Sequence, residues 1–188
     1  MSARIRIALL LAALSGLAGC PLPQPVAQYP DTGSIAPPRI KIADVAPLDT
    51  FVWVDPTACV DPIFTLSASL VDDNTTEAVD ARWFVDYDPA EPFQQRPLAA
   101  ERIEPPPTGT PDPRLRAVTP FPFQAYLFTH ADGDVHLVEL VVSNGFAAEP
   151  LPPTPPGWLP YRTPAANFET QLFRWVFRYR AGGACAYP

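Results

Sequence analysis

Apolar and polar residues alternate along several short stretches of this chain, a pattern typical of β-strands. The longest stretch runs from Val135 to Ser143, and the last one runs from Thr170 to Arg180. Because successive side chains of a strand point to opposite faces, each stretch presents one apolar face for burial. The two faces predicted to be buried carry eight residues: His136, Val138, Leu140, Val142, Phe173, Trp175, Phe177 and Tyr179.

Six further stretches are predicted to be strands, from alternation or from their aromatic and β-branched residues. One is centred on Ile40 and Ile42, and the others span residues 51–54, 64–70, 82–87, 98–103 and 121–128. Within 82–87, three residues are expected to face one way: Trp83, Val85 and Tyr87. Turn-forming residues stand at Asp72-Asp73-Asn74 and at Asn144-Gly145. No helical periodicity of comparable length follows residue 20, so the pattern predicts two packed antiparallel sheets.

The segment from Phe128 to Phe146, FTHADGDVHLVELVVSNGF, resembles the later strands of PKD-like and other immunoglobulin-like domains. Trp83 matches the core tryptophan of the third strand in such domains. The resemblance covers about residues 60–180 and implies an all-β, immunoglobulin-like antiparallel β-sandwich with long proline-rich loops, placed at residues 39–188. Since the turn typical of PKD domains does not follow Trp83, the broader immunoglobulin-like class is the prediction.

The first twenty residues have the layout of an export signal. Arg4 and Arg6 precede an apolar core at Ile7–Leu14, which is too short to span a bilayer because that takes about 20 residues. Leu17-Ala18-Gly19-Cys20 then resembles the lipobox of bacterial lipoproteins. The resemblance implies that residues 1–19 are removed and that acylated Cys20 anchors the chain to a lipid membrane of the cell envelope, with Pro21 favouring the outer membrane. An ordinary signal peptide with a chance cysteine is the alternative.

Residues 20–38 are predicted to form a proline-rich tether, with prolines at positions 21, 23, 25, 30, 37 and 38. Such a segment favours extended backbone, at about 3.1 Å per residue, and would hold a domain away from its anchor.

If Cys20 is acylated, Cys59 and Cys185 remain as a pair. An exported protein meets an oxidising compartment, so a disulfide between them is the expectation, and two free or buried thiols are the alternative. The bond would close one end of the sandwich. Cys59 and Cys185 are 126 residues apart in sequence. In the chain-entropy model a disulfide that closes so long a loop stabilises the fold by about 4–5 kcal/mol.

The charge of the chain excludes one class of partner. The 188 residues include 13 basic and 20 acidic side chains, and the only lysine is Lys41. Removing residues 1–19 takes away two arginines and no acidic residue, which moves the formal charge from −7 to −9. An acidic chain of this kind has no basic surface for nucleic acid.

Candidate chemistry is sparse. His130, Asp132, Asp134 and His136 have the even spacing of ligands on a strand, yet Asp132-Gly133 favours a turn, which would separate them. Calcium at Asp72, Asp73 and Asp88 has no recognised spacing behind it. No catalytic motif is present, so the sequence predicts no enzyme, no metal and no cofactor.

A candidate interaction face lies on the side of the strands opposite to the core. It carries five residues of mixed apolar and charged character: Arg82, Phe84, Glu139, Arg174 and Arg178. Two alternatives are a solvated face with Glu139 paired to an arginine, and a face covered by the proline-rich loops. The predicted function is a membrane-anchored lipoprotein that acts as a binding or structural module for an envelope protein. The alternative is a glycan-binding accessory of an envelope enzyme, with Trp158 and Tyr161 as exposed aromatics.

Overall fold

The computed structural model describes residues 36–59, 62–88, 90, 95–129, 131–147 and 161–183. The chain from Gly33 to Pro188 forms one compact unit. The predicted signal peptide, Cys20 and nearly all of the tether lie outside the described residues, as do His130, Trp158 and Cys185. No helix in the described part is long and apolar enough to cross a bilayer.

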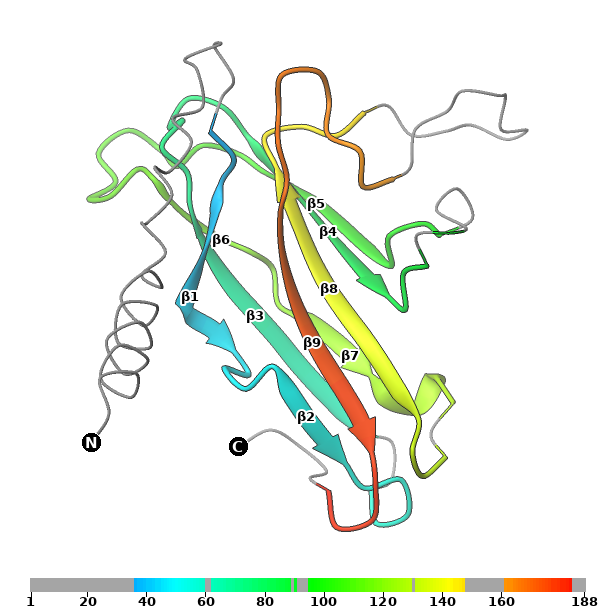
Figure 1. Ribbon diagram of the computed structural model, residues 1–188. Coiled ribbons are helices and arrows are strands. Elements are labelled where there is room, and N and C mark those ends of the chain that lie inside the picture. Colours follow the sequence, from blue (N-terminus) through cyan, green and yellow to red (C-terminus); the bar gives the residue numbers. More distant parts are fainter. Residues whose placement is uncertain are drawn as a thin grey trace, which may run out of the picture. The chain divides into compact units, whose positions relative to one another are not determined.

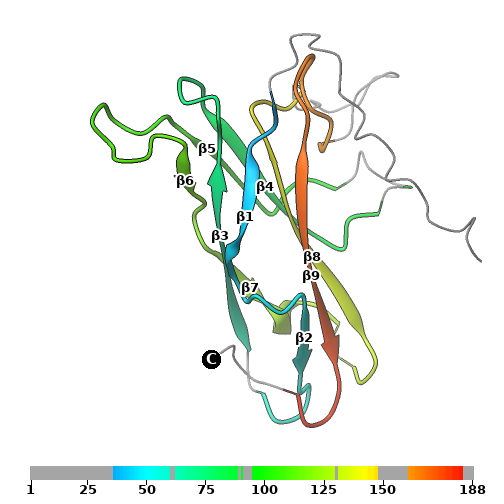
Figure 2. The ribbon, with the colours of Figure 1, turned by 60° about the vertical axis from the view of Figure 1, so that its left-hand side comes forward.

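Two β-sheets pack face to face (Figures 1 and 2). The first sheet has the order β1-β3-β6, with β7 also paired to β3, and the second has the order β2-β9-β8-β4-β5. The strands are β1 (Arg39–Ala46), β2 (Phe51–Val54), β3 (Ile63–Val71), β4 (Val79–Val85), β5 (Ala99–Ile103), β6 (Leu115–Ala117), β7 (Phe121–Gln124), β8 (Val135–Ser143) and β9 (Gln171–Tyr179). Every pairing is antiparallel except that of β2 with β9, which is parallel.

The N-terminal part of the domain contributes a strand to each sheet. β1 pairs with β3, the chain passes the cis Ala46–Pro47 bond, and β2 then pairs with β9 in the other sheet. The Nε1–H of Trp175 donates to the carbonyl oxygen of Pro47 at 2.9 Å, which ties the crossing point to the core. The predicted all-β fold, a sandwich of two mainly antiparallel sheets, is confirmed.

The core lies between the sheets and is dominated by aromatic rings. Trp83 and Trp175 stack with ring centroids 5.6 Å apart, and Phe177 contacts Phe64 and Phe123 from the opposite sheet at 5.1 and 4.4 Å. The apolar faces predicted for 135–143 and 170–180 both point into this core. The alternation therefore identified the buried side of the central strands correctly.

The prediction for Tyr87 is wrong. Tyr87 was expected beside Trp83 and Val85, but it packs on the other side of the sheet, against Phe84. The cause is Asp86, whose φ of +51° places it in the left-handed region and ends the two-residue period of the strand.

One strand was not predicted, and another ends earlier than predicted. β6 lies in a stretch that carried no strand signal, because it is three residues long and its only buried side chain is Arg116. The predicted strand 121–128 ends at Gln124, and Ala125–Leu127 form a single 3₁₀ turn, η1.

Candidate binding surface

The outer face of the five-stranded sheet is where the sequence placed its interaction face. Three of the five predicted residues are buried there: Arg82, Phe84 and Glu139. Phe84 and Glu139 each keep only 1% of their surface exposed, because Tyr161 and Arg162 lie over them. The expectation of an exposed contact surface at these three residues is corrected. The alternative of a covered face describes this part of the sheet.

Tyr161 and Arg162, which we call the cover, are joined to the sheet by an apolar cluster. It contains Phe84, Val141 and Tyr161, with Tyr87 and Phe146 packed against them. The guanidinium of Arg82 donates to the carbonyl oxygen of Tyr161 at 2.6 Å and lies 4.2 Å from the ring centroid of Phe146. Arg82 thus connects the sheet to both ends of the connection between β8 and β9.

The backbone also fixes the cover in place. Phe146 forms a β-bridge with Pro164. The N–H of Ala147 donates to the carbonyl oxygen of Thr163, and the N–H of Ala165 donates to that of Gly145, both at 2.9 Å. These bonds align the segment that leaves β8 with the segment that returns to β9.

A buried carboxylate lies beneath the cover. Glu139 stands opposite Arg174 in the β8–β9 register, and its Oε1 accepts from Nε and Nη2 of Arg174 at 2.8 and 2.6 Å. Its Oε2 is paired with Nη2 of Arg162. The pairing of Glu139 with an arginine, expected for a face without a partner, is therefore present.

Arg162, the arginine of the cover, is largely buried. Its guanidinium lies 3.5 Å from the ring centroid of Tyr87 and 4.7 Å from that of Phe84. Burial lowers the pKa of Arg162 to about 10, which still leaves the side chain protonated at neutral pH. Glu139, Arg162 and Arg174 thus form an internal ion-pair network that holds the cover to the sheet.

The same face is open at its β2 edge, where five side chains form what we call the open patch: Phe51, Trp53, Val135, Arg178 and Arg180. Trp53 and Val135 each stand opposite Arg178 in the strand registers, so the three are direct neighbours. Figure 1 shows β2 lying beside the C-terminal half of β9. Of the predicted face, Arg178 lies in the open patch, and Arg174 lies between the open and covered parts.

A hollow of about 300 Å³ adjoins Trp53 in the open patch. Six residues line it: Trp53, Asp132, Gly133, Arg178, Tyr179 and Arg180. The guanidinium of Arg180 lies 4.4 Å from the ring centroid of Trp53, and that of Arg178 lies 5.5 Å from it. The sequence reasoning singled out Arg178 but missed Trp53 and Arg180, although outward aromatics on a short edge strand were a readable signal.

The stretch with evenly spaced His and Asp residues forms the turn that Asp132-Gly133 favoured. Ala131 to Asp134 form a turn in which the N–H of Asp134 donates to the carbonyl oxygen of Ala131 at 3.0 Å. His136 points into the protein, with Nδ1 2.5 Å from Oδ2 of Asp86 and Nε2 2.6 Å from the carbonyl oxygen of Thr129. The turn is therefore the correct interpretation of this stretch.

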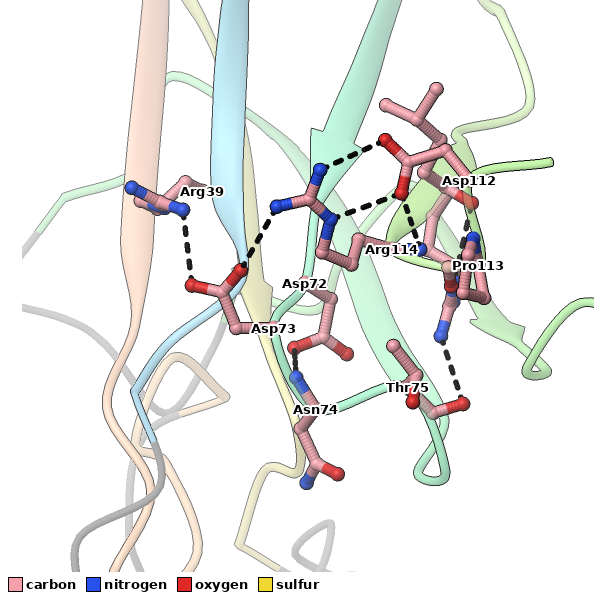
Figure 3. Close-up of polar contacts among 10 residues, drawn as sticks. Arg39, Asp72, Asp73, Asn74, Thr75, Asp112, Pro113 and Arg114 are labelled. Carbon is pink, nitrogen blue, oxygen red and sulfur yellow. Dashed lines mark hydrogen bonds and ion pairs between the residues drawn. The ribbon is translucent and has the colours of Figure 1, made fainter.

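The acidic residues at the end of β3 are engaged by arginines (Figure 3). Asp73 is paired with Arg39 at 3.0 Å and with Arg114 at 4.0 Å, and Arg114 also binds Asp112 at 3.0 Å. These pairs balance the acidic charge with cationic side chains. Within the described ranges, no group of three or more His, Cys, Asp or Glu residues could hold a metal ion.

Asp72 is the buried member of this region. Its Oδ1 accepts from the N–H of Asn74 at 3.0 Å, and its Oδ2 accepts from Nδ2 of Asn144 at 3.2 Å. Burial raises the pKa of Asp72, and these hydrogen bonds partly oppose the shift. Its contacts join the two predicted turn segments, so its role is structural.

Asp55 joins the end of β2 to the turn after β9. Its Oδ1 accepts from the N–H groups of Thr57 and Ala58 at 2.8 and 2.9 Å, and its Oδ2 accepts from the N–H of Gly182 at 2.6 Å. These bonds, led by that from Ala58, hold the pKa of Asp55 well below its usual range. Gly183 also lies so close to the backbone of Val54 that a Cβ there would come within 2.5 Å of the Val54 carbonyl carbon.

We expect Asp55→Asn to lower the thermal midpoint and to make the protein less sensitive to acid. Because the pKa of Asp55 is depressed, its carboxylate stabilises the fold above its ordinary pKa of 3.8, and this stability is lost as the pH falls below that value. The wild type should therefore lose more stability than Asp55→Asn between about pH 5 and pH 2, as measured by thermal unfolding. Asp73→Asn, at an exposed residue, is the control and should lower the thermal midpoint at neutral pH less than Asp55→Asn does. Equal acid sensitivity of Asp55→Asn and the wild type would contradict this role.

The chain matches no protein-family model, no curated protein and no solved structure among those compared.

Proposed function

We propose that this protein is a lipid-anchored binding module of the cell envelope, with no catalytic role of its own. The observation that carries the proposal is Leu17-Ala18-Gly19-Cys20 at the end of a charged and apolar leader, followed by a proline-rich segment and a folded sandwich. Acylated Cys20 would hold the protein at a membrane, with the outer membrane favoured by Pro21. The tether would let the sandwich reach a partner away from the lipid surface.

The open patch is the proposed contact surface for an envelope protein partner. Aromatic residues and arginine are enriched at protein interfaces, and the patch combines Phe51 and Trp53 with Arg178 and Arg180. Among the described strands β2 pairs only with β9, so its other edge is an additional point of attachment.

A disulfide between Cys59 and Cys185 would stabilise this end of the sandwich. The described geometry supports it, because Asp55 and Gly183 bring the segment that leads to Cys59 next to the segment that leads to Cys185. Two alkylatable thiols at these positions in the unreduced, denatured protein would contradict the pairing.

We expect Cys20→Ser to release the protein from the membrane fraction of fractionated cells. Each buried methylene of an acyl chain contributes about 0.8 kcal/mol, so loss of the chains removes most of the membrane affinity. Ser34→Ala in the tether is the control, since it lies outside both the lipobox and the proposed disulfide, and it should leave the protein with the membranes. A Cys20→Ser protein that still sediments with membranes would overturn the lipid anchor.

Site-specific photo-crosslinking in intact cells tests the contact surface. A photoreactive amino acid in place of Phe51 should form a discrete adduct with an envelope protein. The control is the same substitution at Leu98 on the opposite edge of the sheet, because the two side chains are equally exposed, at 60% and 59%. Adducts of equal yield from both positions, or from neither, would refute the open patch as the contact surface.

Glycan binding is the second candidate function, and Trp53 replaces Trp158 and Tyr161 as the aromatic residue proposed to bind the sugar. Tyr161 is buried against Phe84 and cannot offer an exposed ring, and Trp158 lies outside the described residues. Trp53 is an exposed tryptophan beside a hollow, and it is the observation that favours this candidate.

A further inference from the structure

We infer that the hollow beside Trp53 binds an acidic saccharide, that is, a sugar that carries a carboxylate or a phosphate group. The inference rests on the proposed function as a binding module and names the chemistry of one ligand. Its basis is the placement of Trp53, Arg178, Arg180 and Asp132 around the hollow.

The guanidinium groups of both arginines lie over the ring of Trp53. Arg180 and Arg178 lie within 4.4 and 5.5 Å of the centroid of the Trp53 ring. A guanidinium that stacks uses its face, whereas its N–H donors lie in its plane and remain free to bind an oxyanion bidentately. Backbone contacts hold the strand beneath them, since the N–H of Arg180 donates to the carbonyl oxygen of Val54 at 2.9 Å.

Neither arginine has an acidic partner in the part of the chain that the structure describes, where Arg39, Lys41, Arg102, Arg114, Arg162 and Arg174 all do. Arg96 and Arg116 have no ion pair there either, but Arg116 is buried and donates to backbone carbonyl oxygens, and Arg96 has no second arginine beside it in the strand registers. The protein has a formal charge of −7, so two neighbouring cations without an ion pair stand out against an acidic background. Such a site attracts an anion locally while the rest of the surface repels one.

The remaining lining suits a sugar better than a simple anion. Trp53 keeps 38% of its surface exposed and offers an apolar area to the C–H groups of a sugar ring. The carboxylate of Asp132 has no hydrogen-bond partner among the described residues and can accept from sugar hydroxyl groups. The hollow, at about 300 Å³, lies at the lower end of the range for small-molecule sites, which is about 300–1,000 Å³.

Titration of the purified full chain, labelled with ¹⁵N at tryptophan, tests the inference by NMR. Glucuronate and glucose 1-phosphate should shift the indole N–H signal of Trp53, assigned with Trp53→Phe, whereas glucose at the same concentration should leave it unchanged. The double variant Arg178→Gln and Arg180→Gln should weaken binding of both acidic sugars about tenfold or more, because it removes the charged donors. Arg102→Gln, at an exposed arginine of β5, is the control and should bind like the wild type.

Several outcomes would overturn the inference. They are equal shifts with neutral glucose, binding of inorganic phosphate as tight as that of glucose 1-phosphate, tighter binding of a glutamate-rich peptide, and unchanged affinity of the double variant. None of them bears on membrane anchoring or on photo-crosslinking from position 51, so a failure here is distinguishable from a failure of the proposed function.

Discussion

Glu139→Ala should lower the free energy of unfolding by about 3–5 kcal/mol, measured by denaturant titration. Glu139 is 1% exposed and is paired with Arg162 and Arg174. Removal of the carboxylate leaves the guanidinium of Arg162 buried against Phe84 and Tyr87 without a counter-charge. Arg174 is half exposed and can turn to water, so most of the cost arises at Arg162.

Two further variants separate this effect from a general loss of packing. Glu104→Gln removes an exposed carboxylate that pairs only with exposed Arg102 among the described residues, and it should change stability by less than about 0.5 kcal/mol. Replacement of Glu139 by Leu together with Arg162 by Met removes both buried charges and should recover much of the loss. A single Glu139→Ala variant as stable as the wild type would show that the cover does not depend on this network.

Trp175→Ala should destabilise the fold by a similar amount, about 3–5 kcal/mol, in the same denaturant titration. Trp175 has no exposed surface, stacks on Trp83 and contacts the ring of Phe173 edge-on, with centroids 4.5 Å apart. Its N–H also bonds the Pro47 carbonyl at the point where the chain passes from one sheet to the other. The substitution therefore opens a cavity in the core and frees that crossing point.

Matched variants divide the cost into packing and hydrogen bonding. Trp175→Phe keeps an aromatic ring and loses the bond to Pro47, so it should cost about 1–3 kcal/mol. Trp53→Ala changes the same residue type in the open patch and should cost clearly less than Trp175→Ala. Comparable losses at Trp53 and Trp175 would contradict the core that the ring contacts define.

The covered face changes where a partner is to be sought. Charged residues on the outer side of a sheet suggest a solvated or contact surface. Here Arg82 donates to the carbonyl oxygen of Tyr161, and Glu139 is paired with Arg162 and Arg174. The open patch at the β2 edge is the part of that face with exposed aromatics and arginines without an ion pair in the described structure. Mutations meant to disrupt binding should therefore be made at Trp53, Arg178 and Arg180, and those at Phe84 or Glu139 would report stability.

The alternation of side chains was enough to locate most strands and the core face of the central ones. In β9 every second residue from Phe173 to Tyr179 is aromatic, and the matching face of β8 carries Val138, Leu140 and Val142. An extended chain with such a face can bury it against another sheet. The sequence by itself therefore determined the fold class, the buried Trp83 and Trp175, and the turns at 72–74 and 131–134. The N-terminal signal and lipobox are also properties of local sequence, and they stay predictions.

Only the tertiary structure decided what covers the outer face, because the cover depends on contacts between segments far apart in the sequence. Phe84 and Val141 are apolar residues on the outer face of the sheet, and both are buried in the second cluster. From the sequence, an apolar residue in such a position is equally compatible with an exposed contact surface and with a second buried layer. The face is covered because Arg82 binds Tyr161 and Glu139 binds Arg162, and both partners belong to the β8–β9 connection. The left-handed Asp86 and the short strand β6 were likewise set by their surroundings, since three residues or one φ angle carry no periodicity to read.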